Sequence, residues 1–581
     1  MMISPLFTRL LILAFWALSH SAFGHSYQWT NPLTTDGWAP CGQAWPGETE
    51  GYQRLPPRFQ KIARPAVWKL SQNGAGVYLR FFSDSPEIAV RYAFDGPKSM
   101  PHFPETGVSR PDLYRRNQEG EWQWCRGNFS EGLIKFEALA PLPTGRPVEY
   151  QLLLPTYVTT TSLEIGIVSG RKLTAIPRDP TPPIVIWGTS IVQGACATRA
   201  GTSWTTQAHF NLDLPVVNLG FSGNCRLEPE LAREFAKIPA SAFVIDPLQN
   251  NENRTSEQIR ELLGQCIDHF RKAAPDTPLL LIEHAGWGNS LAQASKDAKA
   301  KELNATMRKL VTQLQQAGDT KLHLLTREEI DLNKDAFATV DGIHPNDLGM
   351  KRQSDAVCTK LREILAIPAP TPSTRAVTQD RDFYPWLQRH LAKRQEVATR
   401  RPRVIFIGDS ITHFWTDDKD PKNRESWDTL FPDNDAANLG FGWDRTENTL
   451  WHLQHQILGK HSPDHFVINI GTNNLHRDTT PQILAGVDAI IRHLKLKHPK
   501  SRITLLGIFP RKGLHERIQQ EVNPAYQALA QKRNIEFADP GKTLLTPNGT
   551  PDNKLLPDGL HPNAQAYQKL AKALKSALQP K

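Results

Sequence analysis

The chain of 581 residues contains little cysteine and no long apolar stretch beyond its N-terminal region. None of its six cysteines shows the paired spacing of a zinc site, and all six lie in the first two thirds of the sequence. No run past the N-terminal region reaches the 18 apolar residues that suggest a membrane-spanning helix. These absences argue against a structural zinc centre and against an integral membrane segment.

Clustered charge is also lacking. The formal net charge is +9, but the basic residues are dispersed, and no nucleic-acid-binding motif is present. A basic exterior would favour an anionic polysaccharide or envelope surface, with an ordinary solvated surface as the alternative. Hydrophobic residues make up 39% of the sequence and charged residues 22%, which is typical of a globular protein.

The first 24 residues resemble a secretory signal. Arg9 supplies a positive charge, residues 10–18 form a short apolar core, and residues 22–24 form a small-x-small cleavage site. We therefore predict that residues 1–24 are a signal peptide and that the mature protein is periplasmic or secreted. A hydrophobic first strand is the alternative.

Residues 25–180 are predicted to form a β-sandwich accessory domain. Short β-favouring runs alternate with turn residues, and no helical period is evident up to about residue 178. The runs are residues 76–82, 87–93, 148–154 and 162–168.

Two later stretches alternate between strands and helices. We predict one α/β domain over residues 181–366, a Pro-rich linker over 367–380 and a second α/β domain over 381–581. The first domain begins with a continuous apolar strand at residues 184–187, as expected for a parallel sheet that is covered on both faces. The second domain begins with a helix, and its first strand is expected at residues 404–407. The pattern predicts two doubly wound parallel sheets. Other strands are expected at 216–218, 242–245, 278–282, 465–470 and 503–508, and helices at 257–273, 291–316, 347–365, 386–396 and 563–578.

Both α/β stretches carry the same polar landmarks in the same order. The first set comprises Ser190, Asn218, Asn250, Asp341 and His344, and the second comprises Ser410, Asn438, Asn473, Asp558 and His561. Matching residues are separated by 217 to 223 positions. Such agreement is hard to obtain by chance, so we interpret the two sets as two copies of one site.

The landmarks supply the groups that acyl transfer needs. Each serine follows an apolar strand by a short turn, which places its hydroxyl at the carboxyl edge of the sheet. A serine hydroxyl needs a base to become a good nucleophile. The candidate bases are His344 and His561, and the aspartates three residues earlier, Asp341 and Asp558, can orient them.

Oxyanion donors are available beside each serine. Gly223 can present its backbone N–H, and Asn250 and Asn473 can add a side-chain N–H. In the second copy Trp443 stands at the position of Gly223. Its backbone N–H is retained, but its side chain would narrow the pocket or offer a stacking surface.

These blocks resemble the SGNH or GDSL hydrolase family over residues 182–366 and 400–578. The resemblance implies serine nucleophiles, histidine bases, orienting aspartates, and Gly223 and Asn250 as oxyanion residues. The first copy departs from the family pattern, with Gly-Thr-Ser at 188–190 in place of Gly-Asp-Ser and Asp-Pro-Leu-Gln-Asn at 246–250 in place of Gly-x-Asn.

Each copy also resembles a particular group within this family. The second copy resembles platelet-activating-factor acetylhydrolase Ib subunits, on residues 438–453, 470–474 and 506–511. The first copy and its β region resemble bacterial carbohydrate O-acetylesterases, with an interrupted Gly-x-Asp-Leu-Tyr motif at 107–114.

Disulfides are possible in an exported protein. Because Cys196 and Cys225 flank loops that should meet at the first site, we expect a bridge between them, and a second between Cys41 and Cys125. Free buried thiols are the alternative.

The resulting expectation is an exported serine esterase without metal or cofactor. It would remove short acyl groups, chiefly O-acetyl, from polysaccharide or oligosaccharide through an acyl-serine at two sites. The alternatives are a lysophospholipase or other lipid esterase, and a carbohydrate-binding protein with decayed hydrolase units. We expect an acetylated carbohydrate as partner and no nucleic acid; the oligomeric state stays open.

Overall fold

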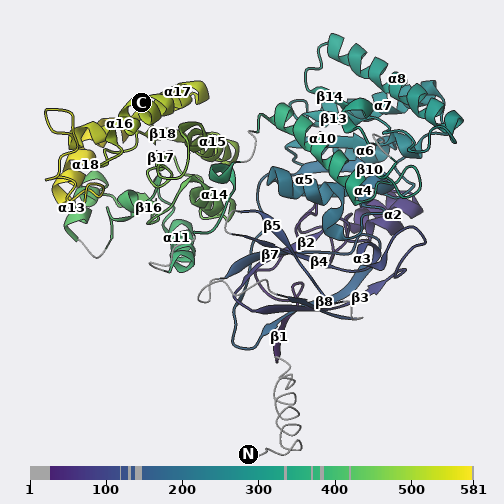
Figure 1. Ribbon diagram of the computed structural model, residues 1–581, viewed down its shortest axis with the longest axis horizontal. Coiled ribbons are helices and arrows are strands. Elements are labelled where there is room, and N and C mark those ends of the chain that lie inside the picture. The colour runs from purple at the N-terminus through teal and green to yellow at the C-terminus, as the bar shows by residue number, and fades with distance from the viewer. Residues whose placement is uncertain are drawn as a thin grey trace, which may run out of the picture.

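The computed structural model describes residues 26–117, 120–128, 132–137, 147–332, 336–367, 371–379, 385–417 and 421–578. The predicted signal peptide, residues 1–24, lies outside these ranges. None of the described helices combines the length and the apolar character needed to pass through a bilayer. Figure 1 shows a β-rich part at the bottom, one α/β unit above it on the right and a second α/β unit on the left.

The β-rich part consists of two antiparallel sheets with a shared core, so the predicted β-sandwich is confirmed. Its sheets have the strand orders β1-β8-β3-β6 and β5-β4-β7-β2-β9. The strands are β1 (Tyr27–Thr30), β2 (Tyr78–Ser83), β3 (Glu87–Asp95), β4 (Asp112–Arg116), β5 (Trp122–Cys125), β6 (Leu133–Glu137), β7 (Val148–Leu153), β8 (Thr159–Val168) and β9 (Leu173–Ala175). Across the paired strands β2 and β7, Phe81 stacks on Tyr150 with ring centroids 5.4 Å apart.

Short helices interrupt the sandwich, which the sequence did not predict. They are η1 (Pro57–Lys61), α2 (Pro65–Ser71) and α3 (Glu105–Val108). The longest has seven residues, too few to show a helical period, although proline occupies the favoured first position of α2.

The first α/β unit contains a fully parallel sheet in the order β11-β10-β12-β13-β14. Its strands are β10 (Ile184–Gly188), β11 (Val216–Gly220), β12 (Ala242–Asp246), β13 (Leu279–Ile282) and β14 (Leu322–Leu325). Its helices are α4 (Ser190–Gln193), η2 (Ala200–Thr202), α5 (Trp204–Leu212), α6 (Pro229–Phe235), η3 (Leu248–Asn250), α7 (Ser256–Ala273), α8 (Ala294–Gln316), α9 (Arg327–Ile330) and α10 (Asp347–Leu365).

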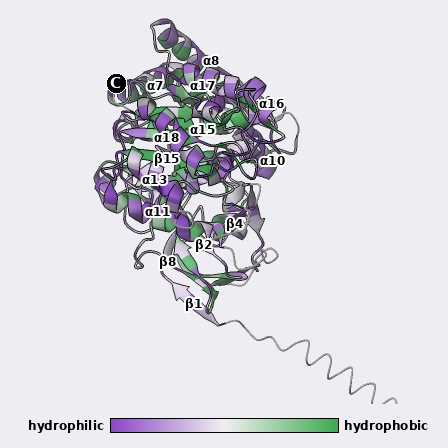
Figure 2. Cartoon of the chain, turned by 90° about the vertical axis from the view of Figure 1, so that its left-hand side faces the viewer, coloured by the Kyte–Doolittle hydropathy of each residue, from purple (hydrophilic) through white to green (hydrophobic). Residues whose placement is uncertain are grey.

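Helices cover both faces of this sheet because successive side chains of each strand point to opposite sides. Val185 and Trp187 of β10 pack with α6, α7 and α8, whereas Ile184 and Ile186 pack with α4, α5 and α10. The continuous apolar strands of the sequence are therefore buried on both faces. Figure 2 shows hydrophobic segments gathered in the interior of the α/β part, with hydrophilic surfaces on the outer helices.

The second α/β unit repeats this topology with the parallel order β16-β15-β17-β18-β19. Its strands are β15 (Val404–Gly408), β16 (Ala436–Gly440), β17 (His465–Asn469), β18 (Arg502–Leu506) and β19 (Glu536–Ala538). Its helices are α11 (Trp386–Arg400), α12 (Ser410–His413), α13 (Pro421–Leu430), α14 (Thr446–Gln454), α15 (Thr480–Lys497), α16 (His515–Arg517), η5 (Ile518–Val522), α17 (Asn523–Arg533), η6 (Pro540–Leu544) and α18 (Ala564–Leu578), with η4 (Pro372–Thr374) before them. The predicted fold class, with two doubly wound sheets, is confirmed.

The sandwich meets the second unit at a buried carboxylate. Glu149 of β7 accepts a hydrogen bond from Arg80 at 2.8 Å, and Arg116 and His455 each lie 3.6 Å from it. Burial raises the pKa of Glu149, but the two guanidinium groups and His455 hold it well below its ordinary value. The sandwich is thus joined to the second unit by a charged network as well as by apolar contact.

The predicted disulfides are wrong, because all six cysteines are free and buried. Cys196 packs in a small cluster under the first serine loop, whereas Cys225 lies in the core on the α6–α8 side of the sheet. Cys41 and Cys125 are likewise held in different clusters of the sandwich. The expectation that the two loops meet at the first site did not determine the direction in which their cysteine side chains point.

Candidate active site

The first serine lies where strand order reverses in the sheet. β10 is flanked by β11 and β12, so the chain leaves its carboxyl end at the switch point where open α/β sheets keep their sites. Gly188 ends β10, and a Cβ there would lie 2.3 Å from Val192. Ser190 follows as the first residue of α4, whose first turn is capped by Thr189 through a bond from the backbone N–H of Ile191.

Ser190, His344 and Asp341 form a connected triad. Ser190 Oγ lies 2.9 Å from His344 Nε2, and Asp341 Oδ2 lies 2.7 Å from His344 Nδ1. The second oxygen of Asp341 accepts the backbone N–H groups of Ile343 and His344 at 3.1 and 2.8 Å. The aspartate therefore holds both the imidazole and the turn that carries it.

The second unit reproduces this geometry. Ser410 Oγ lies 2.9 Å from His561 Nε2, and Asp558 Oδ2 lies 2.6 Å from His561 Nδ1. Asp558 Oδ1 accepts the backbone N–H of Leu560 at 2.9 Å and of His561 at 2.7 Å. The fold thus assembles both predicted triads, although the serine and the histidine of each are more than 150 positions apart in the sequence.

The aspartates of both triads remain ionised under mildly acidic conditions. Burial raises the pKa of Asp341, but the backbone N–H and the imidazole of His344 bring it below its ordinary value. The pKa of Asp558 is lowered in the same way against its burial, by the side chain and backbone of His561 and by Leu560. An ionised carboxylate on Nδ1 leaves Nε2 of each histidine to accept a proton from its serine.

The predicted oxyanion residues of the first site lie on the loops after β11 and β12. Gly223 adopts a φ of 67°, a left-handed conformation that glycine takes without strain. Asn250 Oδ1 accepts the backbone N–H of Cys225 at 3.1 Å, which ties the two loops together. The Nδ2 group of Asn250 is the donor group that this side chain would offer to an oxyanion.

The second site keeps this backbone course with different side chains. Trp443 has the same φ of 67° as Gly223, and the residue is 41% exposed. Asn473 donates a hydrogen bond to the carbonyl of Asp444 at 3.0 Å, again joining the two loops. Since an amide nitrogen carries two hydrogens, one can still serve an oxyanion.

One pair of supporting residues was missed in the sequence. Three residues after each serine, a side chain accepts the backbone N–H of the residue before Gly223 or Trp443. Gln193 accepts from Ser222 at 2.9 Å, and His413 accepts through Nδ1 from Gly442 at 3.2 Å. The equal spacing after Ser190 and Ser410 was the available signal.

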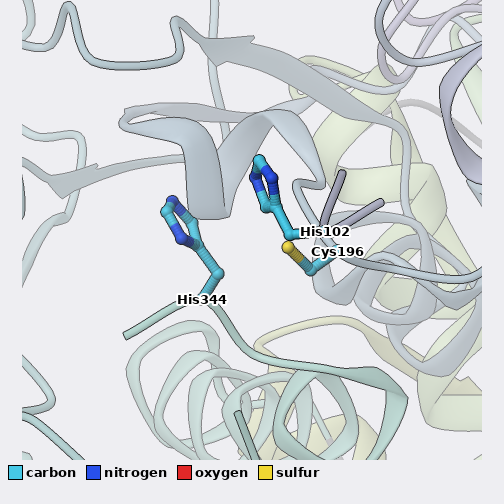
Figure 3. Close-up of side chains that lie close together, drawn as sticks. All are labelled: His102, Cys196 and His344. Atoms are coloured by element: carbon cyan, nitrogen blue, oxygen red, sulfur yellow. The ribbon is translucent and has the colours of Figure 1, made fainter. Parts of the chain in front are cut away.

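Each triad histidine also has a different aromatic neighbour. In the first site the exposed ring of His102, from the sandwich, lies 5.8 Å from the ring of His344, with the thiol of Cys196 close by. Figure 3 shows these three side chains, which come from separate segments. In the second site Phe414 lies 5.0 Å from His561. The surroundings of the two bases therefore differ although the triads match.

A buried carboxylate lies next to each serine turn, but at a different position in each unit. Asp409 precedes Ser410, whereas in the first unit Thr189 takes that place and Asp246 lies at the end of β12, where the second unit has Asn469. Burial raises the pKa of Asp246 to about 7. Burial, together with the nearby Asp444, likewise raises the pKa of Asp409 to about 7.

Such a constellation can carry out nucleophilic acyl transfer. A hydroxyl, an imidazole and a carboxylate are in hydrogen-bond sequence, and backbone and amide N–H groups lie on the adjoining loops. Both triads face solvent, because the side chains of Asp341 and Asp558 are 40% and 56% exposed. The serines themselves are more deeply placed, since Ser190 and Ser410 are 7% and 6% exposed.

Family models match most of the chain. Residues 181–362 and residues 406–569 each match a model of the GDSL-like lipase/acylhydrolase family. Residues 27–173 match the N-terminus of esterases of the SGNH-hydrolase type.

Similar proteins are found among characterised sequences and solved structures. The human platelet-activating factor acetylhydrolase IB subunit alpha1 is 30% identical over 197 residues, which is 33% of this chain and 82% of that protein. The bovine alpha2 subunit is 28% identical over 211 residues, 36% of this chain and 88% of that protein. A structure described as a GDSL-like lipase from Bacteroides ovatus has a TM-score of 0.54 and 26% identity, and the match covers 60% of this chain and 100% of that one.

Proposed function

Because the chain belongs to the GDSL-like lipase/acylhydrolase family, we propose that it is an exported serine esterase that removes O-acetyl groups from polysaccharide or oligosaccharide at two sites. The observation that carries this proposal is the 2.9 Å contact between serine Oγ and histidine Nε2 in each unit. Each contact is extended by an aspartate on Nδ1.

At the first site the reaction begins when Ser190 Oγ attacks the acyl carbon and its proton passes to His344 Nε2. The carbonyl oxygen becomes an oxyanion beside the N–H of Gly223 and the amide of Asn250, and Asp341 stabilises the imidazolium. The C–O bond to the sugar then breaks, and the sugar oxygen takes the proton from His344. Water then attacks the acyl carbon as His344 takes its proton, and the bond from that carbon to Ser190 Oγ breaks. Ser190 Oγ takes the proton from His344, and acetate is released.

The second site supports the same sequence of steps. Ser410 is the nucleophile, His561 the base and Asp558 the orienting acid. The backbone N–H of Trp443 and the amide of Asn473 take the places of the first site's donors.

Two features support a short acyl group. The relatives at about 30% identity are named as acetylhydrolases. Both triads also lie at the surface with half-exposed carboxylates, which suits a small acyl group on a bulky polar alcohol better than a long chain. A long acyl chain would need an extended apolar tunnel to leave water.

The sandwich lies at the first site, which supports a substrate larger than a single ester group. Tyr157 and His102 of the sandwich approach Ser190 and His344, respectively. Of the tryptophans near the sites, Trp204, Trp415 and Trp451 are buried and serve the core. A polymer bound at the first site would contact the sandwich as well as the α/β unit.

The test is acetate release from a panel of acetylated glycans by the wild type, Ser190→Ala and Ser410→Ala. The exposed Ser295→Ala is the matched control. We expect each active-site variant to lose part of the release and the control to lose none. No release from any glycan, together with fatty acid release from a lysophospholipid, would favour a lipid esterase instead.

A further inference from the structure

A buried arginine lies behind the oxyanion loop of the first site. Arg54, only 1% exposed, donates through Nη1 to the carbonyls of Gly220 at 2.6 Å and Asn218 at 3.2 Å, at the end of β11. Its guanidinium also lies over the ring of Phe221, 5.0 Å from the centroid. Gly220 and Phe221 are the residues from which the loop with Gly223 begins.

All the hydrogen bonds of Arg54 go to backbone carbonyls. Its other two hydrogen bonds go to the carbonyls of Asn73 at 3.0 Å and Leu70 at 2.6 Å, and no ion pair of Arg54 is found among the described residues. Burial lowers the pKa of Arg54 to about 9, which leaves the guanidinium charged at neutral pH. Keeping an unpaired cation in this position is costly, so it calls for a role.

The second unit has an arginine at the same place. Arg389 of α11 donates to the carbonyl of Gly440 through Nε at 3.1 Å and Nη2 at 2.9 Å. It lies over the ring of Phe441, 5.3 Å from the centroid. Gly440 ends β16 and Phe441 begins the loop with Trp443, as Gly220 and Phe221 do in the first unit.

The two arginines come from unrelated parts of the chain. Arg54 lies 166 positions before its glycine, in the β-rich N-terminal part, whereas Arg389 lies 51 positions before its own, on a helix. The repeat therefore does not explain the likeness, because neither arginine belongs to the repeated α/β sheet. The same contact, from an arginine to the carbonyl of the last glycine of a strand, is thus made in both units by arginines from different parts of the chain.

We propose that Arg54 and Arg389 are positioning residues that fix the oxyanion loop and place a positive charge behind it. The bond to the glycine carbonyl sets the end of the strand, and stacking on the next aromatic ring sets the start of the loop. The N–H of Gly223 or Trp443 is thereby aimed before substrate arrives. The charge favours the oxyanion more than the neutral ester, so its effect belongs to the transition state.

The test rests on the proposed esterase activity and uses one site at a time. Arg54→Gln is made in Ser410→Ala, and Arg389→Gln in Ser190→Ala, with p-nitrophenyl acetate as substrate. We expect kcat to fall by about tenfold to a hundredfold with KM little changed, below the cost of losing an oxyanion donor itself. Affinity for a boronate transition-state analogue should fall by the same factor, and Arg→Lys should restore part of it.

Two matched controls separate this role from a general effect of packing the N-terminal part, or helix α11, against its α/β unit. Arg58 lies near Arg54 in sequence and pairs with Glu234 of α6, away from the loop. Arg400 lies on α11 with Arg389 but binds the carbonyl of Ala436 at the opposite end of β16. Arg58→Gln and Arg400→Gln should leave kcat and boronate affinity unchanged.

The outcomes are distinguishable. An inactive parent variant would contradict the proposed function, whereas an active parent whose kcat survives Arg389→Gln would overturn this inference. A loss of kcat in Arg400→Gln equal to that in Arg389→Gln would also overturn it, because the loss would then come from weaker packing of α11 against the second unit. If Arg54→Gln does not fold, the half-buried Arg389 still decides the question.

A second inference rests on the side chains in Figure 3. His102, Cys196 and His344 each offer one ligand atom, and these atoms lie within 4.8 Å of one another. Two imidazoles and a thiol are the donors that zinc prefers, at about 2.0 to 2.3 Å. Small movements of the exposed His102 and its neighbours would bring them to that distance.

We infer that a zinc ion bound by these three residues inhibits the first site. Zinc would take His344 away from Ser190 and displace the proton of the Cys196 thiol to solvent. The second site should be spared, because Phe414, which cannot bind a metal, is the ring beside His561.

Zinc titration of the two single-serine variants tests this inference. Ser410→Ala should lose esterase activity at zinc concentrations that leave Ser190→Ala active, and His102→Ala should raise the half-inhibiting concentration at least tenfold. Cobalt should give a thiolate charge-transfer band that is absent in Cys196→Ser. Equal inhibition of both sites, or no effect of His102→Ala, would overturn it.

Discussion

Gly223 and Trp443 have the same left-handed backbone φ of 67° at equivalent positions, although one has no side chain and the other has the largest. A non-glycine residue in this conformation costs about 1 kcal/mol. The second unit has kept the backbone course in spite of that cost. The backbone N–H, which both residues share, is therefore the group that the site requires.

Trp443→Gly tests this interpretation in the Ser190→Ala background. Because the N–H remains and the strain is removed, kcat for p-nitrophenyl acetate should change by less than about threefold. Gly223→Ala, where a Cβ meets nothing within 4 Å, should likewise keep activity in Ser410→Ala while lowering stability by about 1 kcal/mol. A tenfold loss of kcat in Trp443→Gly would mean that the indole itself takes part.

The buried carboxylates beside the serine turns predict that the stability of the folded protein depends on pH. The pKa of Asp409 is raised to about 7, above the value near 4 of an unfolded chain. Folded protein thus binds a proton that unfolded protein has lost, so stability falls as pH rises from about 4 to 7. Asp409→Asn keeps the cap on Ile411 and should raise the melting temperature more at pH 8 than at pH 5.

Asp246→Asn should behave in the same way in the first unit, since Asn469 already occupies that place in the second. The exposed Asp433→Asn serves as the control and should show no such difference. Melting curves at the two pH values provide the measurement. An equal effect at both pH values would show that these carboxylates are not the source.

Thiol titration checks the state of the cysteines. All six are buried and free, so six thiols per chain should react with a disulfide reagent after unfolding in denaturant, and few before it. Reductant should leave the melting temperature unchanged, because no cross-link holds the unfolded chain. Fewer than six reactive thiols in the unfolded protein would restore the disulfide prediction.

The sequence predicted the elements whose signals are local. Continuous apolar strands such as Ile184–Gly188 and helices such as Asp347–Leu365 have a clear periodicity, and their observed bounds lie close to those expected. The triads followed as well, because strand ends in a parallel sheet share one edge. Ser190 and His344 could therefore be paired across 154 positions.

Contacts between unrelated segments could not be predicted. Arg54 and Arg389 reach equivalent carbonyls from different supports, and no spacing in the sequence connects them. The direction in which Cys196 and Cys225 face depends on core packing, which a motif does not encode. The neighbour of His344 comes from the sandwich, so its identity as His102 had no local signal.

The most direct test of the account is the rate of p-nitrophenyl acetate hydrolysis by Ser190→Ala, Ser410→Ala and the double variant. Each unit has its own triad, so each single variant should keep the activity of the other site, and the double variant should fall to the uncatalysed rate. Hydrolysis that continues in a correctly folded double variant would contradict the claim that these two serines are the nucleophiles.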